Sequence, residues 1–151
     1  MKLNKTSWIV FVLIIAVTSH GLYAQAVHEI TLNVDTKNPD PAKACFFEAG
    51  KATTVLNNSS PGTFTIFAQV GDNIIWKGVS STEPNTSVNI AAIKYISGPR
   101  IFSSDLIKGS ESVKATIIRG GKSPYKYQLQ FSVGSNTSMY TIEPKIQIGE
   151  Q

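Results

Sequence analysis

Residues 70–77, VGDNIIWK, are the stretch of the sequence that best indicates the fold. The Gly-Asp pair is typical of a tight turn. The apolar run after it places Ile74 and Trp76 on one face of a strand. Before the turn, residues 64–70 alternate apolar and polar side chains. Two such runs on either side of a turn predict a β-hairpin.

The same alternation recurs along most of the chain. It is clearest in residues 125–133 (YKYQLQFSV) and returns at 30–34 and 113–117. Residues 103–108 (SSDLIK) are the candidate for a short helix, since a serine or aspartate there could cap a single turn. Many short strands without alternating helices predict an all-β fold, an antiparallel Greek-key β-sandwich of about seven to nine strands.

The first 24 residues have the pattern of a secretory signal peptide. Lys2 and Lys5 precede the apolar run at residues 8–17, and small residues follow it. This run is shorter than the roughly 20 residues that a membrane-spanning helix needs. We expect cleavage after Ala24, with Ala26 as the alternative. The product would be a single β-sandwich domain, residues 25–151, periplasmic or secreted and without a membrane span.

Removing this leader also changes the charge. The chain has 14 Lys and Arg, of which two lie in the leader, against 10 Asp and Glu. The formal net charge therefore falls from +4 to +2. A charge this small argues against a nucleic-acid partner, although the C-terminal half is mildly basic.

Few residues are available for covalent chemistry. Cys45 is the only cysteine, so no disulfide can form within the chain. Its apolar neighbours favour a buried thiol, and pairing between chains is the alternative. Outside the leader, His28 is the only histidine. A Ser-His-Asp arrangement would have to use His28, which we expect to lie in a frayed N-terminus. We therefore predict no catalytic residues, no metal and no cofactor.

Two segments resemble the strand framework of the cupredoxins, which are secreted β-sandwiches that bind one copper ion. They are residues 64–78 (FTIFAQVGDNIIWKG) and 123–148, which contain SPYKYQLQFSV and MYTIEPKIQI. Type 1 copper needs two histidines and a cysteine, often with a methionine. Residues 77–80 stand where the family has its first histidine, and Leu129 stands where it has its cysteine. Met139 lies in roughly the expected loop. The resemblance implies the fold without the copper site.

A second resemblance uses three stretches, ITLNVDT (30–36), GDNIIWKGVSS (71–81) and YTIEPKIQI (140–148). Their layout is similar to that of the bacterial inclusion body protein family, small β-sandwich proteins with no known catalysis. It provides no site residues. Both resemblances imply a β-sandwich that is not an enzyme.

Four aromatic residues are the candidates for ligand binding: Trp76, Tyr95, Tyr125 and Tyr140. Flat aromatic faces could stack on a sugar ring or an apolar ligand. The alternative is that these residues fill the core, as the alternation of Tyr125 with Phe131 suggests. We expect an exported binding or interaction module with a protein or carbohydrate partner.

Two other functions remain open. One is a surface or adhesive subunit that forms homo-oligomers through its sheet edges. The other is a small secreted hydrolase whose carboxylates converge in a cleft. Its candidates are the acids that are isolated in sequence: Asp35, Asp40, Glu48, Asp72, Glu83, Asp105, Glu111 and Glu143.

Overall fold

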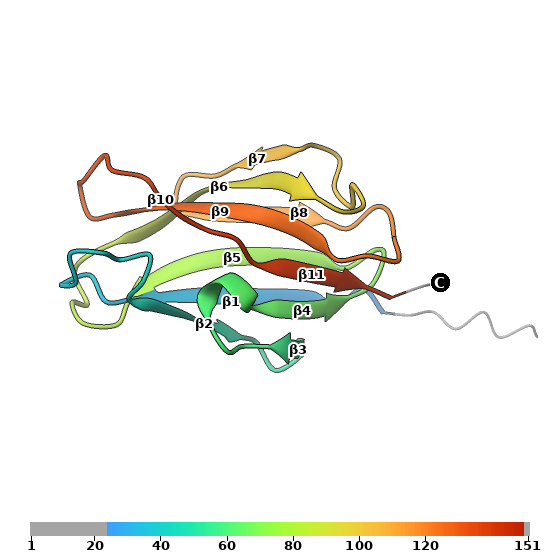
Figure 1. The fold of residues 1–151 in the computed structure, drawn as a ribbon, viewed down its shortest axis with the longest axis horizontal. Coiled ribbons are helices and arrows are strands. Elements are labelled where there is room, and N and C mark those ends of the chain that lie inside the picture. The colour runs from blue at the N-terminus through green and yellow to red at the C-terminus, as the bar shows by residue number, and fades with distance from the viewer. Residues whose placement is uncertain (1–23, 150–151) are drawn as a thin grey trace, which may run out of the picture.

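The computed structural model describes residues 24–149, and the leader predicted from sequence lies outside them up to residue 23. The described residues form eleven strands and one short 3₁₀ helix, arranged in two sheets (Figure 1). This confirms the all-β prediction, although the described residues form more strands than the seven to nine that the sequence predicts. No helix in this part of the chain is both long and apolar enough to span a membrane. The two ends of the described chain lie at the same end of the sandwich (Figure 1).

The smaller sheet has four strands in the order β2-β1-β5-β8. β1 lies inside the sheet, antiparallel to β2 and parallel to β5. β8 forms the other edge, antiparallel to β5. The bounds are β1 (Val27–Val34), β2 (Cys45–Ala49), β5 (Asn73–Ser80) and β8 (Ser112–Thr116).

The larger sheet has seven strands in the order β3-β4-β11-β9-β6-β7, with β10 also paired to β9. β4 and β11 are parallel, and the other pairs are antiparallel. The bounds are β3 (Thr54–Asn57), β4 (Thr65–Ala68), β6 (Val88–Ser97), β7 (Leu106–Lys108), β9 (Tyr125–Val133), β10 (Tyr140–Ile142) and β11 (Lys145–Ile148), with the 3₁₀ helix at Pro61–Thr63.

Three predictions are wrong: the purely antiparallel pairing, the hairpin around Gly71 and the short helix at residues 103–108. Pairing is parallel between β1 and β5 and between β4 and β11, so the sheets are mixed. Residues 64–70 and 73–80 do not form a hairpin, because β4 and β5 lie in different sheets. Gly71, whose φ is 97°, turns the chain from one sheet to the other. Residues 106–108 are strand β7 and not part of a helix, because they pair with residues 92–94 of β6.

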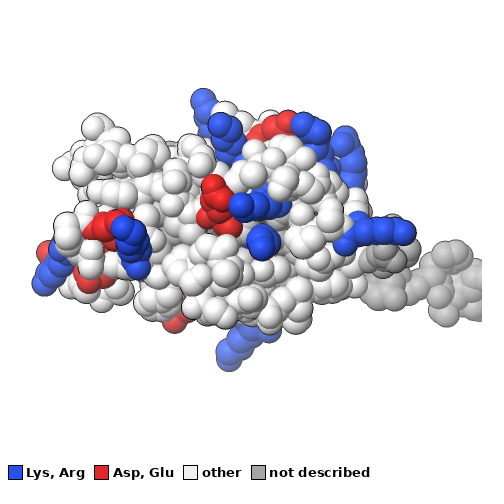
Figure 2. All heavy atoms as spheres, viewed as in Figure 1, with Lys and Arg blue, Asp and Glu red and all other residues white. Residues whose placement is uncertain are grey.

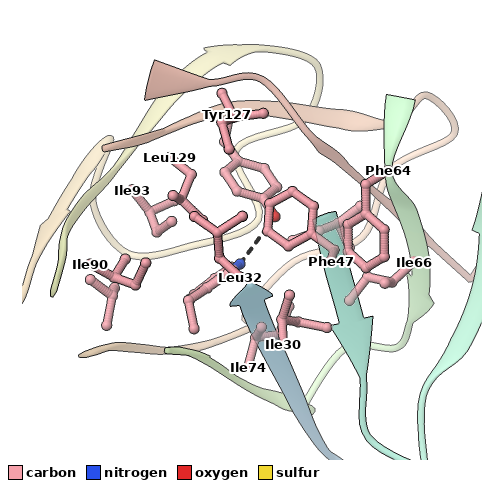
Figure 3. Close-up of a cluster of buried hydrophobic side chains, with 14 of the residues drawn as sticks. Ile30, Leu32, Phe47, Phe64, Ile66, Ile74, Ile90, Ile93, Tyr127 and Leu129 are labelled. Atoms are coloured by element: carbon pink, nitrogen blue, oxygen red, sulfur yellow. Dashed lines mark hydrogen bonds between the residues drawn. The ribbon is translucent and has the colours of Figure 1, made fainter. Parts of the chain in front are cut away.

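The core fills the space between the sheets. Figure 3 shows Leu32 and Ile74 of the smaller sheet packed toward Tyr127 and Leu129 of the larger one. The Nε1–H of Trp76 donates a hydrogen bond to Tyr127 Oη at 3.0 Å, the dashed line in Figure 3. Burial raises the pKa of the Tyr127 hydroxyl, so it stays protonated. This bond joins β5 to β9 across the core.

Candidate functional site

Three of the four predicted binding residues belong to one aromatic cluster. Trp76 and Tyr125 are each 1% exposed, and both contact Phe102 edge-on, with ring centroids 5.9 and 5.1 Å from it. Tyr95 is half-buried and lies 5.8 Å from Tyr125. The Arg100 guanidinium lies 4.6 Å from the centre of the Tyr95 ring. Trp76 and Tyr125 therefore contribute to the core, and Tyr95 is the member of the cluster that reaches the surface.

Tyr140 lies apart from this cluster. It is half-buried on β10, and its ring packs on Phe131 at 5.5 Å. The four residues therefore form no common platform. A binding role for Tyr95 or Tyr140 stays a prediction.

The residues at which the predicted cupredoxin resemblance would place copper ligands have other surroundings. Leu129 is fully buried in the core, and Met139 is half exposed in the β9–β10 loop. Gly78, near the end of β5, approaches Val88 so closely that an added Cβ would lie 2.5 Å from Cγ1 of that valine. Within residues 24–149, no three His, Cys, Asp or Glu side chains lie close enough to hold a metal ion.

Among the acids that could form a hydrolytic pair, Asp35 and Glu83 accept hydrogen bonds from the linked hydroxyls of Thr82 and Thr36. Three of the candidate acids form exposed ion pairs with Lys or Arg: Asp40 with Lys43, Asp105 with Arg100 and Glu143 with Lys126. Each of three surface hollows is lined by at most one carboxylate. A hydrolase that works through two converging carboxylates stays a prediction.

The largest of these hollows lies beside β8, an edge strand of the smaller sheet, and β7, an edge strand of the larger sheet. We call it the β7–β8 groove. Its volume is about 650 Å³. The lining comes from the start of β1 and β5, from segment 102–104, and from β7, β8 and the residues after β8. Its apolar members are Val27, Ile74, Ile75, Phe102, Leu106, Ile107, Ala115 and Ile118, and its polar or charged members are Asn73, Ser103, Ser104, Lys108, Lys114 and Thr116.

The strand register explains how this groove forms. Along β8, Val113 faces the core, so its neighbour Lys114 points outward, where it lies opposite Ile75 of β5. Val27 of β1 is likewise exposed and pairs with Asn73. The outer face of the smaller sheet thus supplies Val27, Ile75 and Lys114, and residues 102–104 and 106–108 supply much of the opposite wall.

The groove is positively charged. Lys108 and Lys114 line it, and no carboxylate does. The nearby acids Asp105 and Glu29 already have basic partners, at 3.0 Å from Arg100 and 3.2 Å from Lys77. Neither lysine forms an ion pair with any residue in the range 24–149. Figure 2 shows Lys and Arg along the upper edge of the molecule, with acidic atoms between them, where Figure 1 places β7.

A second cluster contains His28, which the sequence leads us to expect in a frayed N-terminus. That expectation is wrong, because His28 lies in the interior strand β1 and is 4% exposed. Its Nε2 lies 2.9 Å from Asp72 Oδ2, and its Nδ1 lies 3.1 Å from the hydroxyl of Thr53. A small hollow of about 170 Å³ adjoins it. His28, Thr53 and Asp72 are far apart in sequence, so no motif could have indicated the cluster.

Asp72 connects this cluster to the main chain. Its carboxylate accepts the amide N–H of Ala26 at 2.9 Å and that of Gln69 at 2.8 Å. Burial by itself would raise the pKa of Asp72, but the hydrogen bonds from His28 and the two amides outweigh it and lower the pKa. The cluster therefore holds three segments together: the entry to β1, the β4–β5 turn and the β2–β3 turn.

Comparisons with known proteins identify a similar fold but no family and no function. No family model and no curated protein sequence matches the chain. The structure is similar to the crystal structure of the inclusion body protein PixA from Burkholderia cenocepacia J2315. The TM-score is 0.63 and the identity is 15%, over 83% of this chain and 97% of that one. At this identity the similarity supports the second family resemblance at the level of fold alone.

Two more solved structures give much weaker matches. The solution structure of amebosin has a TM-score of 0.29 and 17% identity, over 60% of this chain and 93% of that one. The McoA multicopper oxidase from the hyperthermophile Aquifex aeolicus has a TM-score of 0.30 and 12% identity, over 87% of this chain and 30% of that one. Neither score supports an argument about fold or copper.

Proposed function

We propose that the protein is an exported, non-catalytic binding module whose ligand lies in the β7–β8 groove. The observation that carries the proposal is the groove itself, about 650 Å³ with a mainly apolar lining. Small-molecule sites typically have about 300–1,000 Å³, apolar walls and a few polar groups that fix orientation. Val27, Leu106 and Ile118 are each more than 40% exposed there. Side chains of this kind that line one hollow are typical of a binding surface.

Export and a cupredoxin-like Greek-key connectivity belong to the same proposal. The N-terminal pattern of residues 1–24 supports export. Fractionation of cells that express the full chain, with mass spectrometry of the product, tests it: cleavage after Ala24 or Ala26 is expected. The proposed scaffold carries no type 1 copper, so stoichiometric copper with an intense visible band in the purified protein would contradict this part.

Binding in the groove can be tested with 1-anilinonaphthalene-8-sulfonate, an apolar fluorescent anion. Leu106→Glu places a carboxylate on the groove wall, and we expect it to weaken probe binding at least tenfold. Leu56→Glu is the matched control, because Leu56 is similarly exposed, 53% against 42%, but lies on β3. If both variants bind the probe as the unaltered protein does, the groove is not the site.

One observation favours a second candidate, a small secreted hydrolase. Asp72, His28 and Thr53 follow one another in the order carboxylate, imidazole and hydroxyl, with contacts of 2.9 and 3.1 Å. This is the order of groups in a nucleophilic triad. Hydrolysis of p-nitrophenyl acetate that is lost in both Thr53→Val and His28→Gln would support the hydrolase. Loss of stability in His28→Gln without any such activity would support a purely structural cluster.

The partner could also be a second copy of this chain, joined through the edges of the sheets. Strand β3 is an edge of the larger sheet, and Val55 and Leu56 are 40% and 53% exposed on it. A register irregularity between Val55 and Asn57 disrupts its pairing with β4, and such bulges discourage further strands from adding. Light scattering that finds a strict monomer at high concentration would remove this alternative.

A further inference from the structure

We propose that the ligand of the β7–β8 groove is a single long-chain carboxylate, an unbranched apolar chain that ends in one anionic group. This inference rests on the proposed function and specifies its ligand class. Two properties of the groove lead to it, the apolar lining and the position of its charges.

The apolar part of the lining suits an extended chain. Val27 and Ile75 come from the outer face of the smaller sheet, and Leu106 and Ile118 come from the segments on either side of β8. Val27, Leu106 and Ile118 are 47%, 42% and 43% exposed, so their side chains are available for contact. Covering them with methylene groups removes apolar surface from water on both partners, which favours binding.

The charged part of the lining selects an anion. Lys108 and Lys114 stand on two different strands that line the same groove, which has no carboxylate in its lining. Arg100 and Lys77 neutralise Asp105 and Glu29. Glu111, in the β7–β8 connection, lines another hollow and forms no ion pair with either lysine, so the lining of the groove keeps a net positive charge. An anionic head group gains from this charge, a neutral ligand does not, and a cationic ligand is repelled.

The lining disfavours a carbohydrate. Sugar rings bind to open aromatic faces, and Phe102 is the aromatic residue of the groove. Its side chain is 4% exposed, because it packs edge-on against Trp76 and Tyr125. An aliphatic chain needs no such face. The carbohydrate partner expected from sequence is therefore replaced here by an amphipathic acid.

The experiment is isothermal titration calorimetry on protein that is expressed from the full chain and purified after export. Sodium dodecanoate, dodecanol and dodecylammonium chloride share one chain length and differ in head-group charge. We expect dodecanoate to bind at least tenfold more tightly than dodecanol and dodecylammonium not to bind. Affinity should rise from octanoate to dodecanoate, by up to about fourfold for each methylene that becomes buried.

Charge variants test the two lysines directly. The double variant Lys108→Gln with Lys114→Gln should bring dodecanoate to within about twofold of dodecanol. Its matched control is Lys37→Gln with Lys51→Gln, two exposed lysines outside the groove, which should keep the preference. The preference should also shrink as salt increases, since exposed charges are screened. Equal loss in both double variants would overturn the role of Lys108 and Lys114.

The outcomes separate this inference from the proposed function. If dodecanol binds as tightly as dodecanoate and Leu106→Glu weakens both, the groove is a binding site but the carboxylate inference is wrong. If no compound binds and Leu106→Glu leaves binding of the fluorescent probe unchanged, both are wrong. If the protein sediments with vesicles of an anionic phospholipid yet does not bind monomeric dodecanoate, a membrane surface replaces the single carboxylate.

Discussion

Replacing Tyr127 by phenylalanine tests the link between the two sheets. In the folded protein, Trp76 Nε1–H donates to Tyr127 Oη at 3.0 Å, and each residue is 1% exposed. Tyr127→Phe removes the acceptor and keeps the ring, whose centroid is 5.7 Å from that of Trp76. The indole N–H is then buried without a partner, which costs about 1–3 kcal/mol. For a domain of this size, that corresponds to a melting temperature lower by roughly 4–12 °C.

Urea and thermal unfolding, followed by tryptophan fluorescence and circular dichroism, would measure this change. Tyr125→Phe is the matched control. Tyr125 lies two residues earlier on β9 and is also 1% exposed, but its hydroxyl has no hydrogen-bond partner among the described residues. We expect Tyr125→Phe to change the free energy of unfolding by less than about 0.5 kcal/mol. Equal stability of the two variants would refute the argument that the Trp76–Tyr127 bond stabilises the core.

Three further predictions concern the pH dependence of stability, the packing around Gly78 and the reactivity of the Cys45 thiol. Because the pKa of Asp72 is lowered in the folded protein, its carboxylate stabilises the fold above its unfolded-state pKa of about 4, and this stabilisation is lost as the pH falls through the lower folded value. The urea midpoint of the unaltered protein should therefore fall between pH 5 and pH 2, and the midpoint of Asp72→Asn should depend less on pH over the same range. Gly78→Ala should destabilise by roughly 1–3 kcal/mol in urea unfolding, because the new Cβ would meet Val88 at 2.5 Å, whereas Gly62→Ala, with nothing within 4 Å, should cost far less. Burial, with a smaller contribution from the charge of Asp40, raises the pKa of the Cys45 thiol to about 11, so iodoacetamide at pH 8 should modify it on the order of a hundredfold more slowly in the folded than in the urea-unfolded protein.

The sequence predicts which faces of the strands are buried better than it predicts which strands are neighbours. Residues 125–133 form β9 as predicted, and Tyr125, Tyr127 and Leu129 face the core in alternation. Alternation reports only that one face is buried, so it could not show that β1 pairs in parallel with β5. For the same reason, the Gly71-Asp72 turn suggests a hairpin although it connects two sheets.

The candidate site was not predictable in the same way. The β7–β8 groove combines Val27, Ile75, Leu106 and Lys114, which come from four separate strands. Each of them alone has the character of an ordinary surface residue, since exposed lysines and single exposed apolar residues are common. The aromatic residues that sequence does single out are large and apolar, and the same properties place Trp76 and Tyr125 in the core.

The interior position of β1 has a consequence for how the chain reaches its folded state. β1 is the first strand of the described chain, yet its parallel partner β5 ends only at Ser80. During synthesis, β2 can pair with one edge of β1 as soon as Ala49 has been made, but the other edge of β1 stays open until β5 is complete at Ser80, when more than half of the chain has been made. Such distant pairing is slow, and an open edge on an apolar strand is prone to aggregate. A host that produces this protein therefore has reason to keep the growing chain bound to a chaperone until β5 is available.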